Sequence, residues 1–330
     1  MGDAAGRILV IKLGALGDIV QALGPFSGIR RHHPDSHITL LTTAPYEAFL
    51  GGSGLFDEVW LDDRPKPWQP RRCLALRSRL RSGGFARVYD LQTSGRSSSY
   101  FRLFWPGPVP EWSGIARGCS HPHANPSRNS MHTLERQAEQ LHDAGIDHVP
   151  PPDLAWAKPD IGRFKPPERY ALMVPGGAAH RPGKRWPAER YGELAGRLAV
   201  AGILPVLLGT STEREILRTI TEACPEARSL AGQTDFGDIV GLARGALVAV
   251  GNDTGPMHLI AIAGCPCVAL YSHQSDPALC GQRGPAVSIL RRPSLDDLTV
   301  GEVAAALPLT DVARRGGKLG AEGRANRMSA

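Results

Sequence analysis

Long hydrophobic runs are scarce in this sequence of 330 residues. The longest, Leu259–Tyr271, is interrupted by Gly264 and Pro266 and falls short of the roughly 20 apolar residues that a membrane span needs. The apolar stretch near the start, Ile8–Ile11, is too short to form the core of a signal peptide. We therefore expect a cytoplasmic protein without a membrane-spanning helix.

Cysteine is also rare, with 6 residues spread along the chain. This number does not make a disulfide framework and suits a reducing compartment. Cys265 and Cys267 form a single C-x-C pair without a second pair, which disfavours zinc. His121 and His123 have no Asp, Glu or Cys at ligand spacing beside them, so we expect them in a solvated loop. The sequence thus predicts neither a bound metal nor a cofactor.

Two motifs of nucleotide-dependent enzymes are missing. Near the start, Gly14 and Gly17 stand without the third glycine of the G-x-G-x-x-G dinucleotide fingerprint, which disfavours an NAD-dependent oxidoreductase. A metal-binding D-x-D is absent as well, because Asp62-Asp63 and Asp296-Asp297 are adjacent pairs.

Charge of one sign is concentrated in two places. The formal net charge is +6, but Arg64–Arg87 alone carries +8, the tail 311–330 carries +3, and the remainder is −5. Beyond Trp68 the arginines have little aromatic interleaving, and no nucleic-acid-binding motif is present, so nucleic acid is not expected as a partner. An anionic substrate or membrane surface would favour such a segment, and a solvated arginine-rich helix face is the alternative.

Short β-branched runs alternate with amphipathic stretches of helical length, which predicts an α/β protein with parallel sheets. In the first half we expect strands at Arg7–Leu13, His37–Thr43, Glu58–Asp62 and Arg87–Leu91, and helices near Asp18–Arg31, Tyr46–Gly51, Pro70–Arg81 and Met131–Ala144. In the second half we expect strands at Tyr170–Val174, Leu204–Leu208, Ala246–Val250 and Cys267–Tyr271, and helices near Ala188–Val200, Thr212–Ala223, Phe236–Arg244 and Pro256–Ala263.

A proline-rich segment separates the two series, with six prolines between residues 149 and 167. We therefore predict a first domain over residues 1–150, a linker over 151–167 and a second domain over 168–310, followed by a basic, disordered tail over 311–330. Two doubly wound domains of this kind are expected to face each other across a cleft lined by the carboxyl ends of their strands.

The first candidate site is the turn Lys12–Asp18, between the first expected strand and helix. One interpretation is structural: Gly14 and Gly17 make the turn and Asp18 caps the helix. The other is catalytic, because a carboxylate at the carboxyl end of a strand, with Lys12 close by, can act as a general base.

The second and third candidate sites are loops that suit a phosphorylated ligand. The loop Val174–Pro187 is rich in glycine, whose exposed N–H groups bind phosphate, and includes Lys184. In Val250–His258, Asp253 or Thr254 is expected to cap a helix, Gly255 allows close approach of a ligand, and His258 either faces a phosphate or packs in the core.

The loop Leu208–Glu215 is the fourth and weakest element. Glu213 or Glu215 can accept hydrogen bonds from ribose hydroxyls. In the structural interpretation, Ser211 or Thr212 caps the following helix and the acids interact with its dipole.

Together these segments resemble the bacterial heptosyltransferases of the lipopolysaccharide core, glycosyltransferase family 9. The residues that carry the resemblance are Ile8–Val20 (I-L-V-I-K-L-G-A-L-G-D-I-V), Pro175–Pro187 (P-G-G…K-R-W-P), Asn252–His258 (N-D-T-G-P-M-H), Asp90–Ser97 and His132–Arg136. Where many members read G-P-T-D-P after the last strand, this chain reads Ser272–Pro277 (S-H-Q-S-D-P).

The resemblance implies the GT-B fold and an inverting, metal-independent transfer of heptose from ADP-heptose. Asp18 would be the catalytic base, and Lys12 would support the base or the departing diphosphate. The implied donor-binding residues are Lys184, Glu213, Asp253, Thr254, Gly255 and His258.

The acceptor implied by the resemblance is an anionic lipopolysaccharide precursor of the Kdo and lipid A type, bound by the first domain. Arg64 in the basic segment, with Arg96 and Arg136 in the two further matching stretches, would bind it. The enzyme would then be peripheral on the inner face of the inner membrane. The alternatives are a GT-B transferase or epimerase that uses another nucleotide sugar, and a non-catalytic nucleotide-binding protein of the same fold.

Overall fold

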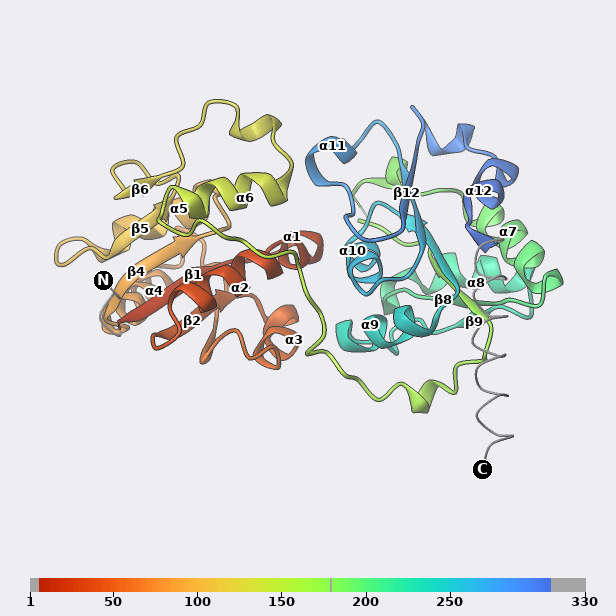
Figure 1. Cartoon of the computed structure of the whole chain (residues 1–330), viewed down its shortest axis with the longest axis horizontal. Coiled ribbons are helices and arrows are strands. Elements are labelled where there is room, and N and C mark those ends of the chain that lie inside the picture. Colours follow the sequence, from red (N-terminus) through yellow and green to blue (C-terminus); the bar gives the residue numbers. More distant parts are fainter. Residues whose placement is uncertain (1–5, 179, 310–330) are drawn as a thin grey trace, which may run out of the picture. The chain divides into compact units, whose positions relative to one another are not determined.

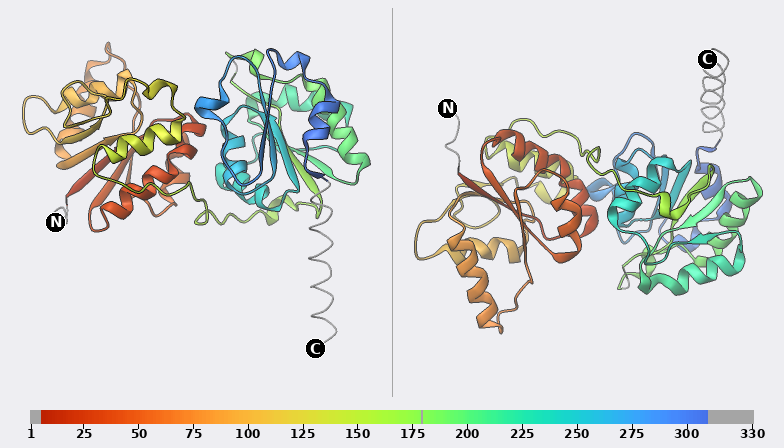
Figure 2. Two further views of the ribbon diagram at one scale, coloured as in Figure 1. Left: turned by 45° about the horizontal axis from the view of Figure 1, so that its top comes forward. Right: turned by 90° about the horizontal axis from the view of Figure 1, so that it is seen from below.

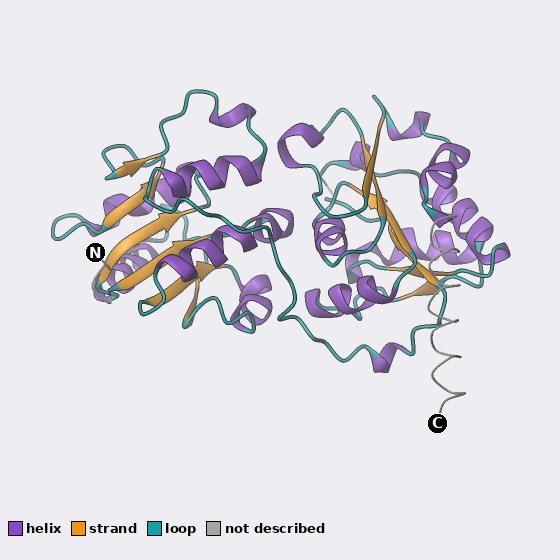
Figure 3. Ribbon diagram, viewed as in Figure 1, coloured by secondary structure: helices purple, strands orange, loops and turns teal. Residues whose placement is uncertain are grey.

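The computed structural model describes residues 6–178 and 180–309. The chain divides into two compact units, unit 1 over Met1–Ala157 and unit 2 over Lys158–Ala330. Each unit has one parallel sheet with helices packed on its faces, so the predicted α/β class is confirmed (Figures 1 and 3). The predicted tail 311–330 lies outside the described residues.

Unit 1 contains a six-stranded sheet in the order β3-β2-β1-β4-β5-β6. The strands are β1 (Arg7–Ile11), β2 (His37–Thr42), β3 (Glu58–Leu61), β4 (Phe85–Asp90), β5 (Glu111–Gly114) and β6 (His121–Pro122). The helices are α1 (Leu16–Gln21), α2 (Leu23–His32), α3 (Glu47–Gly51), α4 (Pro70–Ser82), α5 (Gly95–Tyr100) and α6 (Thr133–His142), with 3₁₀ turns η1 (Ala44–Tyr46), η2 (Phe101–Phe104) and η3 (Arg128–Ser130).

Unit 2 also contains a six-stranded sheet, in the order β12-β11-β10-β7-β8-β9. Its strands are β7 (Tyr170–Val174), β8 (Leu204–Leu207), β9 (Arg228–Ser229), β10 (Val248–Asn252), β11 (Cys267–Tyr271) and β12 (Val287–Arg291). Its helices are α7 (Ala188–Val200), α8 (Arg214–Ala223), α9 (Phe236–Gly245), α10 (Gly255–Ile262), α11 (Pro277–Cys280) and α12 (Val300–Ala306), with 3₁₀ turns η4 (Gly162–Phe164), η5 (Pro182–Lys184), η6 (Ser211–Glu213) and η7 (Leu295–Asp297).

The two sheets have the same topology. When the strands of each unit are counted from its own first strand, both sheets read 3-2-1-4-5-6, and the neighbouring strands of the described residues pair in parallel. This is the Rossmann order, in which ligands bind at the carboxyl ends of the strands where the order reverses. That switch point lies between β1 and β4 in unit 1, and between β7 and β10 in unit 2 (Figure 2 shows both sheets from further sides).

Burial explains why the central strands read as continuous apolar runs. In β1, Leu9, Val10 and Ile11 are 0% exposed, because helices cover both faces of the sheet. In unit 2, the amphipathic helix α7 buries Tyr191, Leu194, Ala195 and Leu198, at the spacing of one helical face. Among the described residues, no helix has the length and hydropathy to cross a membrane.

One predicted helix proves to be two. The pattern suggests a single helix over Asp18–Arg31, but α1 ends at Gln21 and α2 begins at Leu23. Pro25 explains the break, since it lacks an N–H group and its ring would clash with the carbonyl of Gln21 in a continuous helix.

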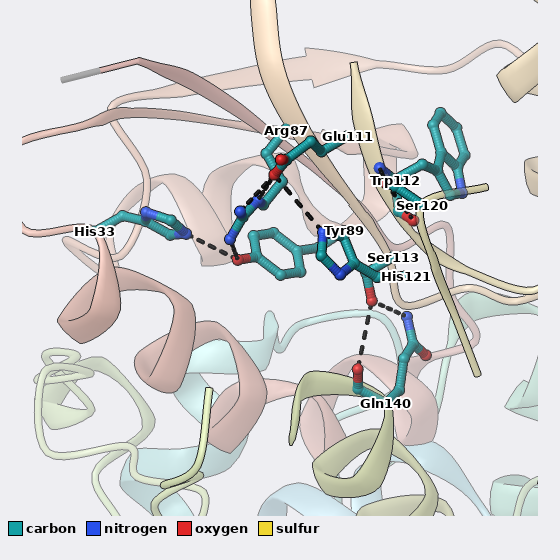
Figure 4. A network of polar contacts seen from close by, with 9 residues as sticks. All are labelled: His33, Arg87, Tyr89, Glu111, Trp112, Ser113, Ser120, His121 and Gln140. Atoms are coloured by element: carbon teal, nitrogen blue, oxygen red, sulfur yellow. Dashed lines mark hydrogen bonds and ion pairs between the residues drawn. The ribbon is translucent and has the colours of Figure 1, made fainter. Parts of the chain in front are cut away.

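Sequence reasoning missed the outer strands β5, β6, β9 and β12, because edge strands are short and weakly patterned. The solvated loop predicted around His121 and His123 is wrong, since His121 lies in β6 and His123 is buried. Figure 4 shows the polar contacts that hold this edge: Gln140 of α6 points at Ser113 of β5, and Arg87 of β4 and His121 point at Glu111.

Candidate active sites at the strand ends of the two units

The end of β1 places a lysine in the interior of unit 1. Lys12 is 3% exposed, and its Nζ donates a hydrogen bond to the carbonyl oxygen of Leu91, 2.9 Å away and just beyond β4. Burial lowers the pKa of Lys12, whereas the negative charge of Asp18 acts in the opposite direction. Lys12 and Asp18 therefore lie within electrostatic reach of each other.

Asp18 lies inside the first turn of α1. The prediction that it caps the helix is wrong in register, because Ala15 is the N-cap residue and Asp18 the third helical residue. Its Oδ2 accepts a hydrogen bond from the N–H of Ala15 at 3.1 Å, so the carboxylate folds back over the turn. At Gly14 φ is +110°, and a Cβ would lie 2.7 Å from the ring of Tyr46, which makes glycine necessary there.

A pocket of about 480 Å³ opens beside this turn. Its wall includes Ala15, Tyr46, Arg64 and Arg96. Burial raises the pKa of Tyr46, with Arg64 lowering it and Asp18 raising it further. A phenol and two guanidinium groups thus line a pocket close to the Asp18 carboxylate.

Both arginines of the pocket bind main-chain oxygen atoms. Arg64 donates to the carbonyl oxygen of Leu13, and Arg96 donates to that of Pro65 at 3.1 Å. A carbonyl group orients a guanidinium group but does not neutralise it. Both positive charges can therefore act on an anionic ligand in the pocket.

Arg136 lies elsewhere. It is on α6, where its Nη2 approaches the Thr133 hydroxyl at 3.5 Å, and it is not part of the pocket wall. Its positive charge lowers the pKa of Lys12. The structure therefore brings Arg64 and Arg96 into one pocket, and places Arg136 near Lys12 instead.

The basic segment Arg64–Arg87 is not a uniform surface. Arg72 pairs with Asp63 at 3.0 Å, and the guanidinium carbon of Arg79 lies 4.3 Å from the ring centre of Trp60. Arg77 donates to the carbonyl oxygen of Leu103 at 3.2 Å. Part of the +8 charge is thus used to fix helix α4 to its own unit.

In unit 2, Asn252 at the end of β10 anchors the glycine-rich loop that follows β7. Its Nδ2 donates to the carbonyl oxygens of Pro175 at 2.7 Å and Gly176 at 3.0 Å. Its Oδ1 accepts from the N–H of Trp186 and from the Tyr191 hydroxyl, both at 3.0 Å. This one buried amide therefore fixes both ends of the loop that contains Lys184.

Lys184 and Asp253 form an ion pair at the same switch point. The Nζ of Lys184 lies 2.6 Å from Oδ2 of Asp253, and the two side chains are 13% and 8% exposed. Ser275 donates to the same oxygen atom at 2.6 Å. Burial tends to raise the pKa of Asp253, but the hydrogen bonds from Lys184 and Ser275 outweigh it, and the pKa is lowered. Asp253 therefore stays ionised and orients the lysine.

Glu213 connects two loops of unit 2. Its Oε1 accepts from the N–H of Gly177 at 2.8 Å, and its Oε2 accepts from the N–H of Thr210 at 2.8 Å and the Thr210 hydroxyl at 2.9 Å. The prediction that Ser211 or Thr212 caps this helical segment is wrong, because Thr210 is the N-cap residue. Both oxygen atoms of Glu213 are thus engaged within the unit.

The helix α10 begins directly after the ion pair. Thr254 is its N-cap residue, but no side chain caps it, since the Thr254 hydroxyl donates to the carbonyl oxygen of Asn252 at 3.2 Å. The prediction that Asp253 or Thr254 caps this helix is confirmed for Thr254 by its position, although its side chain makes no capping hydrogen bond. Gly255 is the first helical residue, and His258 is 6% exposed one turn later.

Three polar residues of the two sites were not singled out from the sequence: Asp90, Asn252 and Ser275. Asp90 and Asn252 are the last residues of β4 and β10, and a polar residue that ends a buried strand is the signal that finds them. Ser275 lies in Ser272–Pro277, where the chain differs from the family pattern, and its contact with Asp253 shows what this segment does. Within residues 6–178 and 180–309, no group of three His, Cys, Asp or Glu side chains is arranged to hold a metal ion.

The family model described as glycosyltransferase family 9 (heptosyltransferase) matches residues 73–293. Lipopolysaccharide heptosyltransferase 2 of Escherichia coli K12 is 39% identical over 307 residues, a match that covers 82% of this chain and 83% of the relative. Lipooligosaccharide heptosyltransferase 2 of Haemophilus influenzae is 35% identical over 113 residues, and this match spans only 33% of either chain.

The fold is similar to that of a solved structure, the E. coli ADP-heptose lipopolysaccharide heptosyltransferase II. The TM-score is 0.76 at 24% identity, with 94% of this chain and 99% of that chain covered. The expected GT-B fold is thereby confirmed. The family match and the long E. coli alignment, together with the strand-end sites, show that this chain is an enzyme of glycosyltransferase family 9, the heptosyltransferase family.

Proposed function

We propose that the protein transfers heptose from ADP-heptose to an anionic acceptor of the lipopolysaccharide core, with inversion at the anomeric carbon and without a metal ion. The observation that carries this proposal is the Asp18 carboxylate, which is bound to the N–H of the pocket residue Ala15, lies within electrostatic reach of buried Lys12, and has two arginines in the same pocket wall. The E. coli relative is named a lipopolysaccharide heptosyltransferase, and the solved E. coli structure is named an ADP-heptose lipopolysaccharide heptosyltransferase.

In this mechanism Asp18 is the general base. It takes the proton of the acceptor hydroxyl while the hydroxyl oxygen forms a bond to the anomeric carbon. The bond between that carbon and the β-phosphate oxygen breaks, and ADP leaves with the electron pair. Attack from the face opposite ADP inverts the anomeric configuration. The positive charge of buried Lys12 and the negative charge of Asp18 attract each other across the turn.

Unit 2 would supply the positive charge that the departing diphosphate needs. Lys184 is oriented by Asp253, and the main-chain N–H groups at the start of α10 add the positive end of a helix dipole. Gly255 permits close approach of the phosphate. His258 is the weakest member of this set, because its burial also fits a packing role.

Unit 1 would bind the acceptor. Arg64 and Arg96 bring two positive charges to the 480 Å³ pocket, and carboxylate or phosphate groups of a core precursor match them. Glu213 would contribute mainly by holding the donor loop, because both of its oxygen atoms already accept hydrogen bonds.

The direct test is a transfer assay with ADP-heptose and a purified core acceptor, in which the anomeric configuration of the product is read by NMR. We expect inversion, and equal rates with and without EDTA. A thermal-shift screen against ADP, UDP, GDP and dTDP checks the donor separately, and we expect stabilisation by ADP alone. Selective stabilisation by UDP, or a retained configuration, would contradict the proposal.

We also propose that the enzyme works at the cytoplasmic surface of the inner membrane. Trp68, just before α4, and Leu74, within α4, are 73% and 60% exposed. Exposed apolar groups therefore stand in the same segment of chain as the arginines of α4. We expect co-sedimentation with vesicles that contain phosphatidylglycerol, weakening with salt, and little with phosphatidylcholine. Equal binding to both vesicle types would rule out the electrostatic component.

A further inference from the structure

The last residue of the fourth strand carries a different charge in the two sheets. In unit 2 this residue is Asn252, a neutral amide with four hydrogen bonds. In unit 1 it is Asp90, which is 0% exposed and has the same place in the topology. Unit 1 thus places a carboxylate where unit 2 has a fully satisfied amide.

The carboxylate of Asp90 is only half satisfied. Its Oδ1 accepts from the N–H groups of Gln92 at 3.1 Å and Thr93 at 3.0 Å. Its Oδ2 is buried without a hydrogen-bond partner in the described part of the chain. The Ser97 hydroxyl favours ionisation of Asp90, but makes its own hydrogen bonds with Ser94. Burial raises the pKa of Asp90 to about 6, against these hydrogen bonds and the charge of Lys12.

Lys12 lies close to Asp90, because its Nζ donates to the carbonyl oxygen of Leu91, the residue that follows Asp90. In the pairing of β1 with β4, Ile11 lies opposite Asp90, so Lys12 follows directly beyond this pair. The attraction acts in both directions: Asp90 raises the pKa of Lys12, and Lys12 lowers that of Asp90. The buried ammonium group of Lys12 therefore interacts electrostatically with two carboxylates, the buried Asp90 and the partly exposed Asp18.

Other ionisable groups also act on this pair. Arg128 and Cys119 interact electrostatically with Asp90, and Arg136 from α6 opposes the charge of Lys12. In the proposed reaction Asp18 loses its negative charge when it takes the acceptor's proton. At that moment Lys12, buried and facing Arg136, keeps only one carboxylate counter-charge, that of Asp90.

We propose that Asp90 is a positioning residue for the transfer reaction, the buried counter-ion that keeps Lys12 charged while Asp18 accepts the proton. The role in transfer rests on the proposed function. The pairing of Asp90 with Lys12 does not, and can be tested without any substrate.

The substrate-free test is Asp90→Asn with the full-length protein. Asparagine keeps the oxygen atom that accepts from Gln92 and Thr93, removes the charge, and reproduces the residue of unit 2. We expect the pKa of Lys12, followed by NMR of labelled lysine side chains and assigned with Lys12→Met, to fall, because the negative charge of Asp90 raises it in the wild type. An unchanged pKa would overturn the pairing.

The matched control is Asp57→Asn. Asp57 also accepts a main-chain hydrogen bond in unit 1, from Ile38 at 2.7 Å, but is not part of the site. This variant is expected to leave the pKa of Lys12 unchanged, and an equal fall in both variants would overturn the inference. If Asp90→Asn does not fold, Lys12→Met provides the reciprocal measurement: the pKa of Asp90 is expected to rise, and a constant value counts against the pairing.

The second readout is the pH profile of kcat. In the wild type we expect kcat to fall as the pH drops through about 6, where Asp90 takes up a proton. Asp90→Asn is expected to lower kcat about tenfold at neutral pH and to lack this step, with the KM for the donor unchanged. A variant with wild-type kcat and the same acid limb would overturn the positioning role. A wild type that transfers no heptose, with Lys12 still coupled to Asp90, would instead refute only the proposed function.

Discussion

The switch points of the two sheets share one topology but differ in the charged side chains that they contain. In unit 1, Lys12 is buried, its pKa is lowered, and its neighbours Asp18 and Asp90 are both acids. In unit 2, the last residue of the strand is a neutral amide, Asn252. The charged pair of this unit, Lys184–Asp253, involves the residue that follows the strand. In the proposed mechanism this difference separates two tasks: unit 1 holds groups whose protonation changes, and unit 2 holds a fixed charge for binding.

Asp18→Asn is the substitution with the largest expected effect, and it tests whether unit 1 contains the group that accepts the proton. Asparagine preserves the hydrogen bond from the Ala15 N–H but cannot take a proton. We expect kcat to fall at least about 100-fold, the scale of a lost general base, while ADP affinity measured by calorimetry stays unchanged. Near-normal turnover would remove Asp18 from the chemistry and leave unit 1 without a proton acceptor of its own.

Lys184→Ala should act on binding instead. It removes a positive charge and also leaves Asp253 as an unpaired anion close to the proposed diphosphate site. We expect ADP affinity to fall more than about tenfold, because an uncompensated buried charge costs several kcal/mol. The double variant Lys184→Ala/Asp253→Asn should recover part of the loss, and no recovery would show that Asp253 does not orient the lysine.

Arg64→Ala and Arg96→Ala test whether unit 1 binds the acceptor and not the donor. Each is expected to raise the acceptor KM about five- to tenfold with an unchanged donor KM, since both residues line the pocket of unit 1. Arg71→Ala is the matched control, because Arg71 is an exposed arginine of the same basic segment on α4. An equal effect of all three substitutions would indicate general attraction by charge rather than a pocket.

The smallest expected effect is an opposite pH dependence of stability in the two units. The pKa of Asp90 is raised to about 6, so its contribution is complete below its unfolded value of 3.8 and is lost as the pH rises through 6. Between pH 5 and pH 7 this loss is about 1 kcal/mol. The pKa of Asp253 is lowered, so its contribution is present above 3.8 and is lost at more acid pH.

Hydrogen exchange resolved by peptide follows each unit separately. Asp90→Asn should abolish the change between pH 5 and pH 7 in unit 1 and leave unit 2 as it is. A change of the same sign in both units would show that the contrast between the two switch points has no thermodynamic consequence.

The sequence predicts the central elements well and the polar contacts poorly. Strands such as β1 and β7 are visible because buried parallel strands read as apolar runs. The ion pair between Lys184 and Asp253 is not visible, because 69 residues separate the partners and only the fold brings them together. Asp62 and Asp90 look alike in sequence, each ending an apolar run.

Their surroundings differ in the folded chain. Asp62 accepts from the Tyr100 hydroxyl at 2.7 Å and from the N–H of Arg64 at 2.7 Å, which satisfies both of its oxygen atoms. Asp90 keeps one oxygen atom without a partner in the described chain and lies near a buried lysine. No local pattern distinguishes the two, because the difference depends on residues from other strands and helices.

Glu213 has a practical consequence for engineering. It links the Gly176–Gly177 loop to the turn at Thr210, and a Cβ at Gly176 would come within 1.9 Å of its Oε1 atom. The two loops therefore form one structural unit that has to be exchanged as a whole. A chimera that grafts a foreign sugar-nucleotide loop onto this scaffold has to carry the Thr210–Glu213 turn of the same parent with it.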